Sequence, residues 1–488
     1  MNTETKELKF FYIGSFLISL LSSYFIWLQT SKYGVDLSPD SIVYMKWAQN
    51  ILDNGLGFII SNNDAKWPPL YPLIIAVFSK ISHADIVSVA RHFSCCLIFF
   101  TCFLLTLLLK KLSGKRFVSA IAFGLFIPFS IPLNLVYSFA WSEPLFIFLL
   151  ILIAFSIEKT TYSRLVLCGF LSASAILTRY AGVTIVPAVC LLIFIQKSSL
   201  TDKIKKCFCY AIIPTLIYIT YIFRNYYFTK TLMGPRVASS TGLILNATRA
   251  CATIALWFSG RNFFVATLFI LIFIIVILNH KKQIPSYFVK CSNIAIFSIS
   301  FLVIYFIFIV ISSTTTAYDP IDVRLMSPAF PFILITLFSA FVSMDLLQQK
   351  TKFYYAGLLL YLFLISISVV TTIEDLEYRK NHGTYGYNSV SWQENKLILY
   401  LKESDIIQSS DPVISNDPFA LFIVNKKIYA DSAYQSSTSI CQKFGGYFFV
   451  FFYIPTSSPL ERLFSECEME TITKTSDGSL FRITNPKQ

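Results

Sequence analysis

The stretch DLSPDSIVYMKWAQNILDNGLGFIISNNDAKWPPLYP, residues 36–72, separates two long apolar runs, Phe10–Gln29 and Val87–Leu109. Each run has roughly the 20 apolar residues that a helix needs to cross a bilayer. The stretch between them is polar and aromatic, and its Pro68-Pro69 pair cannot lie in a helix interior. The sequence therefore predicts a membrane protein whose first two spans are joined by a long loop, residues 30–86.

The composition of the whole chain agrees with this prediction. Of its 488 residues, 55% are hydrophobic and 14% charged, against about 25% charged residues in soluble domains. An ordinary soluble enzyme and a disordered chain are excluded. About eleven apolar segments are expected to span the membrane, of which the fourth to sixth are short: Phe10–Gln29, Val87–Leu109, Phe117–Val136, Pro144–Ile157, Leu165–Thr178, Val183–Ile195, Phe208–Arg224, Phe263–Leu278, Ile294–Ser312, Pro328–Leu346 and Phe353–Thr371.

The net charge of +13 could mark an anionic partner or the topology of the membrane part. Its distribution favours topology, because basic residues gather before the first span and on every second connection. By the positive-inside rule, the N terminus is cytoplasmic, the C terminus lies outside, and no nucleic-acid partner is expected. The residues concerned are Lys6, Lys9, Lys110, Lys111, Lys115, Arg116, Lys159, Arg164, Lys197, Lys203, Lys205, Lys206, Lys281, Lys282, Lys290, Lys350 and Lys352.

A polar tail begins near Thr372, so we divide the chain into a membrane domain, residues 1–371, and an extracytoplasmic domain, residues 372–488. The tail carries a net charge of −3. Its pattern predicts a small α/β domain, in which Cys441 and Cys467 could pair in an oxidising compartment or remain free. The expected elements are a helix over Ser389–Glu403 and strands over Pro412–Ser415, Leu421–Val424, Tyr447–Ile454 and Leu480–Ile483.

Asp40 is the first candidate for chemistry. It follows Pro39 at the start of an amphipathic pattern that includes Tyr44, Trp47 and Ile51. Such a helix is expected in the membrane interface, with its aromatic side chains at headgroup level. A carboxylate there can act as a general base or hold a divalent metal ion. The alternative is that Asp40 only caps the helix.

Three further charges fall at predicted outer ends of spans: Glu143, Arg179 and Arg324. Charged residues at membrane depth are costly and are candidates for function. Arg179 is also an exception to the inside-positive pattern. The two arginines could clamp a phosphate, whose oxygens match the guanidinium fork. The alternative is that they snorkel to the interface or pair with Glu143, Asp319 or Asp322.

An ordered set of short motifs resembles the bacterial GT-C membrane glycosyltransferases of a family 39-like type, relatives of protein O-mannosyltransferases and of the lipid A aminoarabinose transferase. The resemblance covers about residues 10–430. It rests on Pro39-Asp-Ser-x-x-Tyr44, Ala48-x-Asn50, Gly55-x-Gly57-Phe58, Trp67-Pro-Pro-Leu-Tyr-Pro72, Ser142-Glu-Pro-Leu-Phe146, Thr178-Arg-Tyr-Ala-Gly182, Arg324-Leu-x-x-Pro328 and Val413-Ile-Ser-Asn416.

The resemblance implies an α-helical polytopic fold of the GT-C type in a bacterial inner membrane, with an outer active site. It implies transfer of a sugar from a polyprenyl-phosphate donor to a lipid, glycan or protein acceptor. Asp40 matches the family's catalytic aspartate, which deprotonates or orients the acceptor and binds a metal in some members. Arg179 and Arg324 would meet the donor phosphate. The remaining candidates for substrate binding are Tyr44, Lys66, Glu143, Tyr180 and Asp322.

The sequence departs from the family's branches at two places in the first loop. Lys66 stands where the aminoarabinose-transferase branch has a glutamate two residues before the Pro-Pro pair, so the acid-lined metal site of that branch is not carried over. Ser41 follows Asp40 where protein mannosyltransferases have an Asp-Glu pair, so their protein acceptor is not carried over either.

Two other functions compete with the glycosyltransferase. A flippase or transporter for lipid-linked glycans would show charges in span centres, broken helices and a sequence repeat. A Wzy-like polymerase would be expected to carry its largest outer loop between later spans. Here few charges fall in span centres, no repeat is found, and the first loop and the tail are the largest outer parts. The glycosyltransferase is therefore favoured.

Overall fold

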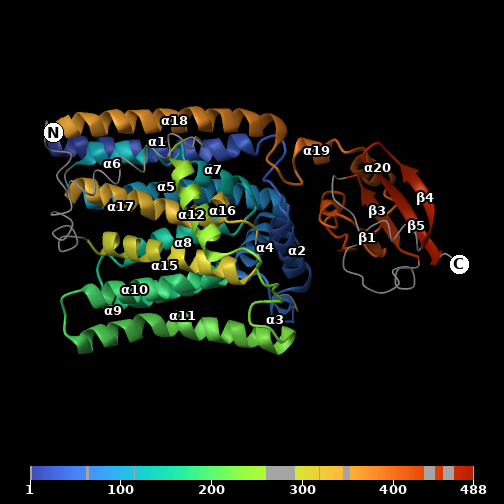
Figure 1. Ribbon diagram of the computed structural model, residues 1–488, viewed down its shortest axis with the longest axis horizontal. Helices are drawn as coiled ribbons and strands as arrows, with labels where there is room; N and C mark the ends of the chain where they lie inside the picture. The colour runs from blue at the N-terminus through green and yellow to red at the C-terminus, as the bar shows by residue number, and fades with distance from the viewer. Residues whose placement is uncertain are drawn as a thin grey trace.

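The computed structural model describes residues 3–61, 65–114, 116–259, 292–317, 319–343, 352–432, 446–453 and 467–486. Figure 1 shows a bundle of helices lying side by side, with the N terminus at one end and a small sheet beyond the other. The predicted fold class, a helical membrane protein with a small C-terminal α/β domain, is confirmed. The bundle includes α1 (Thr3–Gln29), α5 (Ile86–Ser113), α8 (Glu143–Ser156), α9 (Tyr162–Thr178), α10 (Ile185–Ile195), α11 (Leu200–Thr229), α12 (Leu243–Trp257), α15 (Asn293–Thr315), α17 (Phe330–Ser343) and α18 (Lys352–His382).

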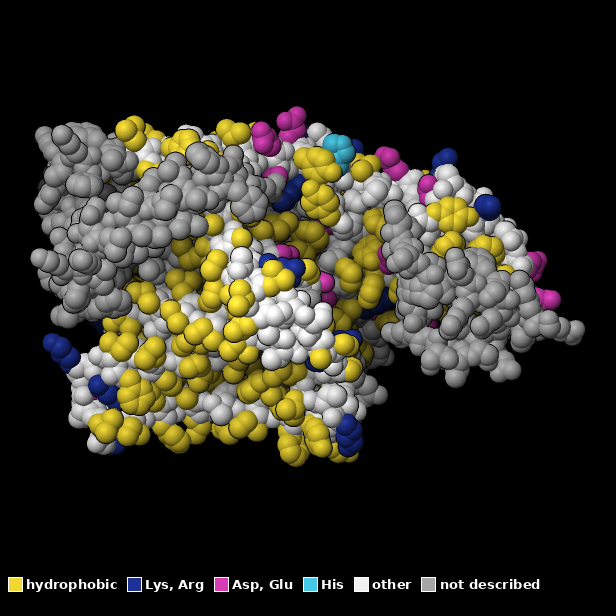
Figure 2. All heavy atoms as spheres, viewed as in Figure 1, with side chains coloured by type: hydrophobic (Ala, Val, Ile, Leu, Met, Phe, Trp, Pro, Cys, Tyr) yellow, Lys and Arg dark blue, Asp and Glu magenta, His cyan; other side chains and the backbone are white. Residues whose placement is uncertain are grey.

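Six of the described helices are long and apolar enough to cross a membrane. They cover Thr5–Gln29, Ile86–Ser113, Leu200–Thr229, Asn293–Thr315, Val323–Val342 and Leu359–His382. Hydrophobic side chains cover much of the flank of the bundle in Figure 2. On α11, Leu216 and Phe223 are 57% and 72% exposed. An apolar surface of this kind suits lipid as its surroundings.

Most predicted spans coincide with a helix, but the third does not form one continuous helix. The segment Phe117–Val136 divides into α6 (Phe117–Gly124) and α7 (Ile131–Ser138). Pro128 and Pro132 fall in and just after the intervening turn, where each removes a backbone donor and resists a continuous helix. The eighth predicted span, Phe263–Leu278, lies outside the described residues.

Connections expected on the cytoplasmic side meet one another at the end of the bundle that holds the N terminus (Figure 1). Glu158 pairs with Lys111, and lies 3.8 Å from the guanidinium of Arg164. The amide of Gln196 donates to Asn293 at 3.1 Å, and Asn293 donates to the carbonyl of Glu158 at 2.9 Å. The predicted connections thus share one end, while their side of the membrane stays a prediction.

The first loop forms three helices at the other end of the bundle: α2 (Pro39–Asn54), α3 (Gly57–Ser61) and α4 (Leu70–Ser82). Tyr44 and Trp47 on α2 are buried, at 3% and 6% exposed, so they pack inside the protein rather than at headgroup level as expected. Pro68 and Pro69 lie outside a helix, as expected, and Leu70 begins α4 directly after them. Proline is tolerated in a first helical turn, where the N–H is not needed.

The C-terminal sheet has the strand order β2-β1-β3-β5-β4. Strand β1 runs parallel to its neighbours β2 and β3, whereas β5 is antiparallel to β3 and β4. The predicted strands over Pro412–Ser415, Tyr447–Ile454 and Leu480–Ile483 correspond to β1, β3 and β5. The bounds are β1 Val413–Ser415, β2 Ala430–Ser432, β3 Phe448–Phe452, β4 Cys467–Lys474 and β5 Gly478–Pro486.

Two predicted elements of this domain are wrong. Leu421–Val424 is not a strand: the 3-10 helix η3 (Ala420–Ile423) forms there, and the Asp417 carboxylate accepts the N–H of Ala420 at 3.4 Å. The single helix over Ser389–Glu403 is instead α19 (Val390–Gln393) and α20 (Lys396–Ser404). Asn395 interrupts it, because its side chain caps α20.

Two further predictions for the tail, its starting residue and the pairing of its cysteines, stay predictions. Helix α18 continues to His382, beyond the predicted domain boundary at residue 371, so the division into residues 1–371 and 372–488 stays a prediction. Cys441 lies outside the described residues, so its pairing with Cys467 stays one too.

Candidate functional site

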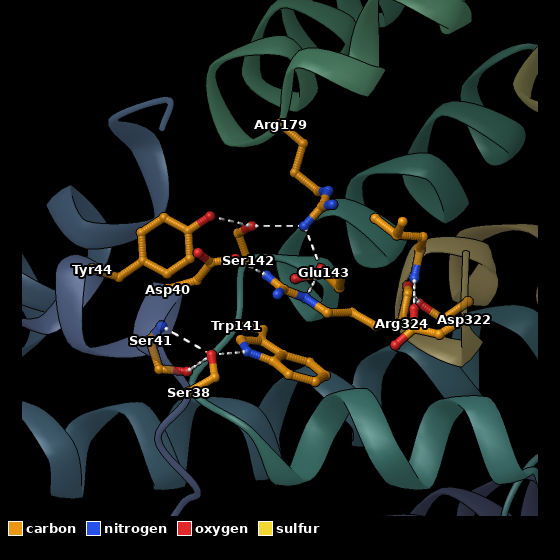
Figure 3. Close-up of polar contacts among 12 residues, drawn as sticks. Ser38, Asp40, Ser41, Tyr44, Trp141, Ser142, Glu143, Arg179, Asp322 and Arg324 are labelled. Carbon is orange, nitrogen blue, oxygen red and sulfur yellow. Dashed lines mark hydrogen bonds and ion pairs between the residues drawn. The ribbon is translucent and has the colours of Figure 1, made fainter. Parts of the chain in front are cut away.

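The charges singled out in the sequence meet at the end of the bundle nearest the sheet (Figure 3). Asp40 comes from the first turn of α2, and Glu143 begins α8. Arg179 follows the last residue of α9, and Arg324 lies in the short helix α16 (Val323–Met326). These four residues are called the charge cluster below.

Glu143 is the centre of the charge cluster. Its side chain is fully buried, and its Oε1 atom lies 2.5 Å from Arg179 Nη1 and 2.6 Å from Arg324 Nε. The Oε2 atom has no hydrogen-bond partner among the described residues. A buried carboxylate needs opposite charge to offset its lost hydration. The sequence left open whether the two arginines pair with Glu143, and the structure shows that both of them pair with it.

Arg324 joins Glu143 to Asp40. Its Nη2 atom lies 2.7 Å from Asp40 Oδ2, while its Nε atom contacts Glu143. The guanidinium also lies over the ring of Trp141, 4.2 Å from the ring centroid, a favourable cation–π arrangement. The Trp141 indole donates to Ser38 Oγ at 2.7 Å. Trp141 was not predicted, although it directly precedes the Ser142-Glu143-Pro144 motif.

Asp40 is the most exposed residue of the charge cluster. Ser38, rather than Asp40, caps α2, because its hydroxyl accepts the N–H of Ser41 at 3.3 Å. The Asp40 side chain is 32% exposed, against 14% for Arg324, 15% for Arg179 and none for Glu143. Asp40 is therefore the member of the charge cluster that is most accessible from outside.

Tyr44 adds a hydroxyl to this site. Its OH lies 3.1 Å from Ser142 Oγ, which also accepts a hydrogen bond from Arg179 Nη1 at 3.2 Å. Burial, and next the nearby Asp40 carboxylate, raise the pKa of Tyr44 above its ordinary value, so the phenol stays protonated. The ring of Tyr71 packs edge-on against that of Tyr44, with centroids 5.4 Å apart.

Of the other three predicted site residues, Tyr180 and Asp322 lie close to members of the charge cluster along the chain, and Lys66 lies in the first loop. Tyr180 donates to the carbonyl of Ala65 at 2.6 Å, which ties it to the first loop. Asp322 is exposed and caps α16 by accepting the N–H of Leu325 at 3.1 Å, next to Arg324 (Figure 3). Lys66 is exposed, with its ammonium 5.9 Å from the ring centroid of Trp67. Among the described residues, the ion pairs within the charge cluster are formed by its four members and do not include Lys66.

A divalent metal ion at Asp40 fits these residues poorly. Among the described residues, no group of three or more His, Cys, Asp and Glu side chains could hold a metal ion. Asp40 and Glu143, the two carboxylates of the charge cluster, are bridged by the guanidinium of Arg324. A cation between them would have to displace that guanidinium, so we derive no chemical step through a metal.

Comparison with solved structures identifies the fold. The chain superposes on ArnT from Cupriavidus metallidurans bound to undecaprenyl phosphate with a TM-score of 0.61, at 11% identity, over 96% of this chain and 97% of ArnT. It superposes on the Archaeoglobus fulgidus oligosaccharyltransferase in complex with Zn and sulfate with a TM-score of 0.54, at 10% identity, over 96% of this chain and 73% of that one.

The archaeal oligosaccharyltransferase AglB from Archaeoglobus fulgidus, in complex with an inhibitory peptide and a dolichol-phosphate, gives a TM-score of 0.54 at 10% identity, over 98% of this chain and 74% of that chain. No protein-family model matches the sequence, and no curated protein matches it either. The likeness is one of fold. The chain has the GT-C fold that the ordered motifs predicted.

Proposed function

We propose that the chain is a membrane glycosyltransferase that moves a sugar from a polyprenyl-phosphate donor to an acceptor hydroxyl at the outer face of a bacterial inner membrane. The observation that carries the proposal is the convergence of Asp40, Arg179 and Arg324 around the buried Glu143. The GT-C fold supports it, and so do two solved neighbours, which hold undecaprenyl phosphate and a dolichol-phosphate.

In the proposed reaction, Asp40 is the general base. The acceptor hydroxyl gives its proton to the Asp40 carboxylate, and its oxygen attacks the anomeric carbon of the sugar. The bond from that carbon to the phosphate oxygen breaks, and its electron pair leaves with the polyprenyl phosphate. The exposure of Asp40 supports this role, because a base must come within hydrogen-bond reach of the proton it accepts.

Arg179 and Arg324 are proposed to neutralise the departing phosphate. Guanidinium groups match phosphate oxygens, and donors held in place before the reaction stabilise charge that develops in the transition state. Glu143 has a different role in this scheme. Because its side chain is fully buried, it holds the two arginines rather than contacting the substrate. We therefore class Glu143 as a positioning residue.

The proposal is tested by comparing Asp40→Asn with Asp53→Asn in membranes supplied with a polyprenyl-phosphate sugar. Both aspartates lie on α2, but Asp53 is 44% exposed and 3.9 Å from Lys427, away from the charge cluster. We expect Asp40→Asn to reduce transfer by about 100-fold or more, the range of general-base catalysis, and Asp53→Asn to leave it unchanged. Full transfer by Asp40→Asn would remove Asp40 as the base.

A second pair of variants tests the donor site. Arg179→Ala should raise the KM for the donor more than the KM for the acceptor, because one of the two cations proposed for the phosphate is lost. Arg164→Ala is the matched control, since Arg164 is 41% exposed and lies 3.8 Å from Glu158 at the opposite end of the bundle. An unchanged donor KM in Arg179→Ala would contradict the assignment.

A broader experiment identifies the substrates. Mass spectrometry of glycolipids from cells with and without the gene should show one glycan that loses a single sugar in the deletion strain. Movement of a lipid-linked sugar between leaflets without any new glycosidic bond would favour a transporter instead. Loss of chain length from a repeat polymer, with each repeat unit intact, would favour a polymerase.

A further inference from the structure

Asp36 is a buried acidic residue outside the charge cluster. It connects the backbone segment that carries Asp40 to the segment that carries Glu143. Asp36, 3% exposed, donates its N–H to the carbonyl of Ser138 at 2.9 Å and accepts the N–H of Ala140 at 3.0 Å. Four residues after Asp36 comes Asp40, and three residues after Ala140 comes Glu143. The two carboxylates of the charge cluster are thus carried by segments that are joined at Asp36.

The C-terminal domain contacts the same point from the opposite side. The N–H of Tyr387 donates to the carbonyl of Leu37 at 2.8 Å, and the Asn388 side chain donates to the carbonyl of Val35 at 2.8 Å. Residues 35–37 therefore form the middle of three backbone segments. One outer segment leads into the charge cluster, and the other, residues 386–388, follows α18 into the sheet domain.

The Asp36 side chain stabilises the contact between residues 35–37 and 386–388. One carboxylate oxygen accepts the N–H of Leu37 at 2.8 Å, and the other accepts the N–H of Gly386 at 3.1 Å. A Cβ atom on Gly386 would overlap with the Asp36 carboxylate, so this approach requires glycine. The cation that lowers the pKa of Asp36 is Arg379 of α18, whose guanidinium also donates to the Gln29 side chain at 2.9 Å.

Burial raises the pKa of Asp36 to about 6, which means that the folded protein disfavours its charged form. A buried acid of this kind weakens the fold at neutral pH. In return, its carboxylate holds the N–H groups of Leu37 and Gly386, while the main chain of the same residue bonds to Ser138 and Ala140.

Arg324 shows why the spacing of these segments matters. It contacts Asp40 at 2.7 Å and Glu143 at 2.6 Å at once, so a small shift of either segment breaks one of these contacts.

We propose that Asp36 is a positioning residue through which the C-terminal domain sets the spacing of the Asp40 and Glu143 segments. Its predicted effect on turnover rests on the proposed glycosyltransferase function, whereas its effect on the two segments does not. Ser38 and Trp141 extend the same junction, because the Trp141 indole donates to Ser38 Oγ at 2.7 Å just before the charge cluster.

Two variants test the junction, which is the set of contacts among residues 35–37, 138–140 and 386–388. One changes Asp36 and the other changes its partner Gly386. Asp36→Asn replaces one acceptor oxygen with an NH2 group that would face a backbone N–H. Gly386→Ala leaves Asp36 intact and inserts a methyl group against it. The matched controls are Asp411→Asn, where Asp411 accepts the N–H of Gln408 at 2.7 Å within its own loop, and Gly242→Ala, where a Cβ would meet nothing within 4 Å.

The first measurement is hydrogen exchange of the full-length protein in detergent. Both junction variants should exchange at least tenfold faster in peptides covering residues 37–44 and 139–146, with β3 and β5 unchanged. The controls should match the wild type. Faster exchange confined to residues 384–389, or spread over the whole chain, would overturn the proposal, because the junction would then not transmit position to the charge cluster.

The second measurement is sugar transfer. Both junction variants should lower kcat by tenfold or more and change each KM by less than twofold, because the substrate-binding side chains themselves are retained. A kcat equal to that of the controls, together with faster exchange in the two segments, would overturn the positioning role. If the wild-type chain transfers no sugar from any donor, the proposed function fails, and the exchange experiment still decides whether Asp36 links the segments.

Discussion

Removing the charge of Glu143 is the perturbation whose size the structure defines best. In Glu143→Gln the side chain keeps its shape and one acceptor oxygen, but it loses the negative charge that faces Arg179 and Arg324. Both contacts are short, at 2.5 and 2.6 Å, and the carboxylate has no exposure to solvent. Hydrogen bonds to charged groups contribute about 1.5–3 kcal/mol each, and breaking a buried ion pair costs about 3–5 kcal/mol.

We therefore expect Glu143→Gln to lower the free energy of unfolding by about 3–5 kcal/mol, because two cations remain partly buried with less compensation. The assay is equilibrium unfolding in detergent micelles, followed by tryptophan fluorescence. Glu158→Gln is the control, since Glu158 is 32% exposed in its pair with Lys111, and such surface pairs contribute about 0–1 kcal/mol. Equal effects of the two substitutions would refute the reasoning.

A triple substitution separates stability from function at the same place. Glu143→Leu combined with Arg179→Met and Arg324→Met removes the buried charges together, and well-packed apolar replacements of buried ion pairs are often neutral or stabilising. We expect this variant to regain most of the stability lost in Glu143→Gln, yet to transfer no sugar. Continued transfer would mean that the arginines are not needed for the phosphate.

Three further predictions concern the surroundings of the charge cluster. Burial raises the pKa of Asp36 from 3.8 to about 6, so between these pH values the folded state binds a proton that the unfolded state lacks. The free energy of unfolding should therefore fall by about 2 kcal/mol as the pH rises from 4 to 6. Asp36→Asn should remove this slope, and an identical slope in the variant would contradict the assignment. Burial lowers the pKa of Lys46 from 10.5 to about 8, although its ammonium donates to the carbonyl of Ile428 at 3.1 Å. The free energy of unfolding should therefore rise between pH 8 and 10.5 in the wild type and stay level in Lys46→Met. The same unfolding assay measures both. Tyr44→Phe should cost about 1 kcal/mol, because it removes the contact with Ser142 Oγ, and a loss above about 3 kcal/mol would show a larger role for that hydroxyl.

The sequence predicted the helices of the bundle well wherever long apolar runs were uninterrupted. The period and length of such runs are local properties, so α1, α5, α11 and α15 lie where they were expected. The break between α6 and α7 was missed because residues 125–130 are almost as apolar as their flanks. Apolarity alone does not distinguish a continuous span from two short helices joined by a turn.

The charge cluster was predicted in part, for a related reason. Asp40, Glu143, Arg179 and Arg324 were identifiable because charge is rare in an apolar sequence. Their mutual pairing could not be derived, because it depends on which helix ends meet in space. Asp36 belongs to the first loop, but its role could not be derived from the sequence, since its partners lie about 100 and 350 residues away along the chain.

The balance of charge within the cluster has a consequence for how a substrate would arrive. Two carboxylates and two guanidiniums cancel, so the charge cluster has no excess of positive charge that would attract an anion from a distance. Long-range steering needs an excess of one sign and weakens as salt is added. A lipid-anchored phosphate would then reach the site by lateral diffusion in the bilayer, and its capture rate should hardly change between low and physiological ionic strength.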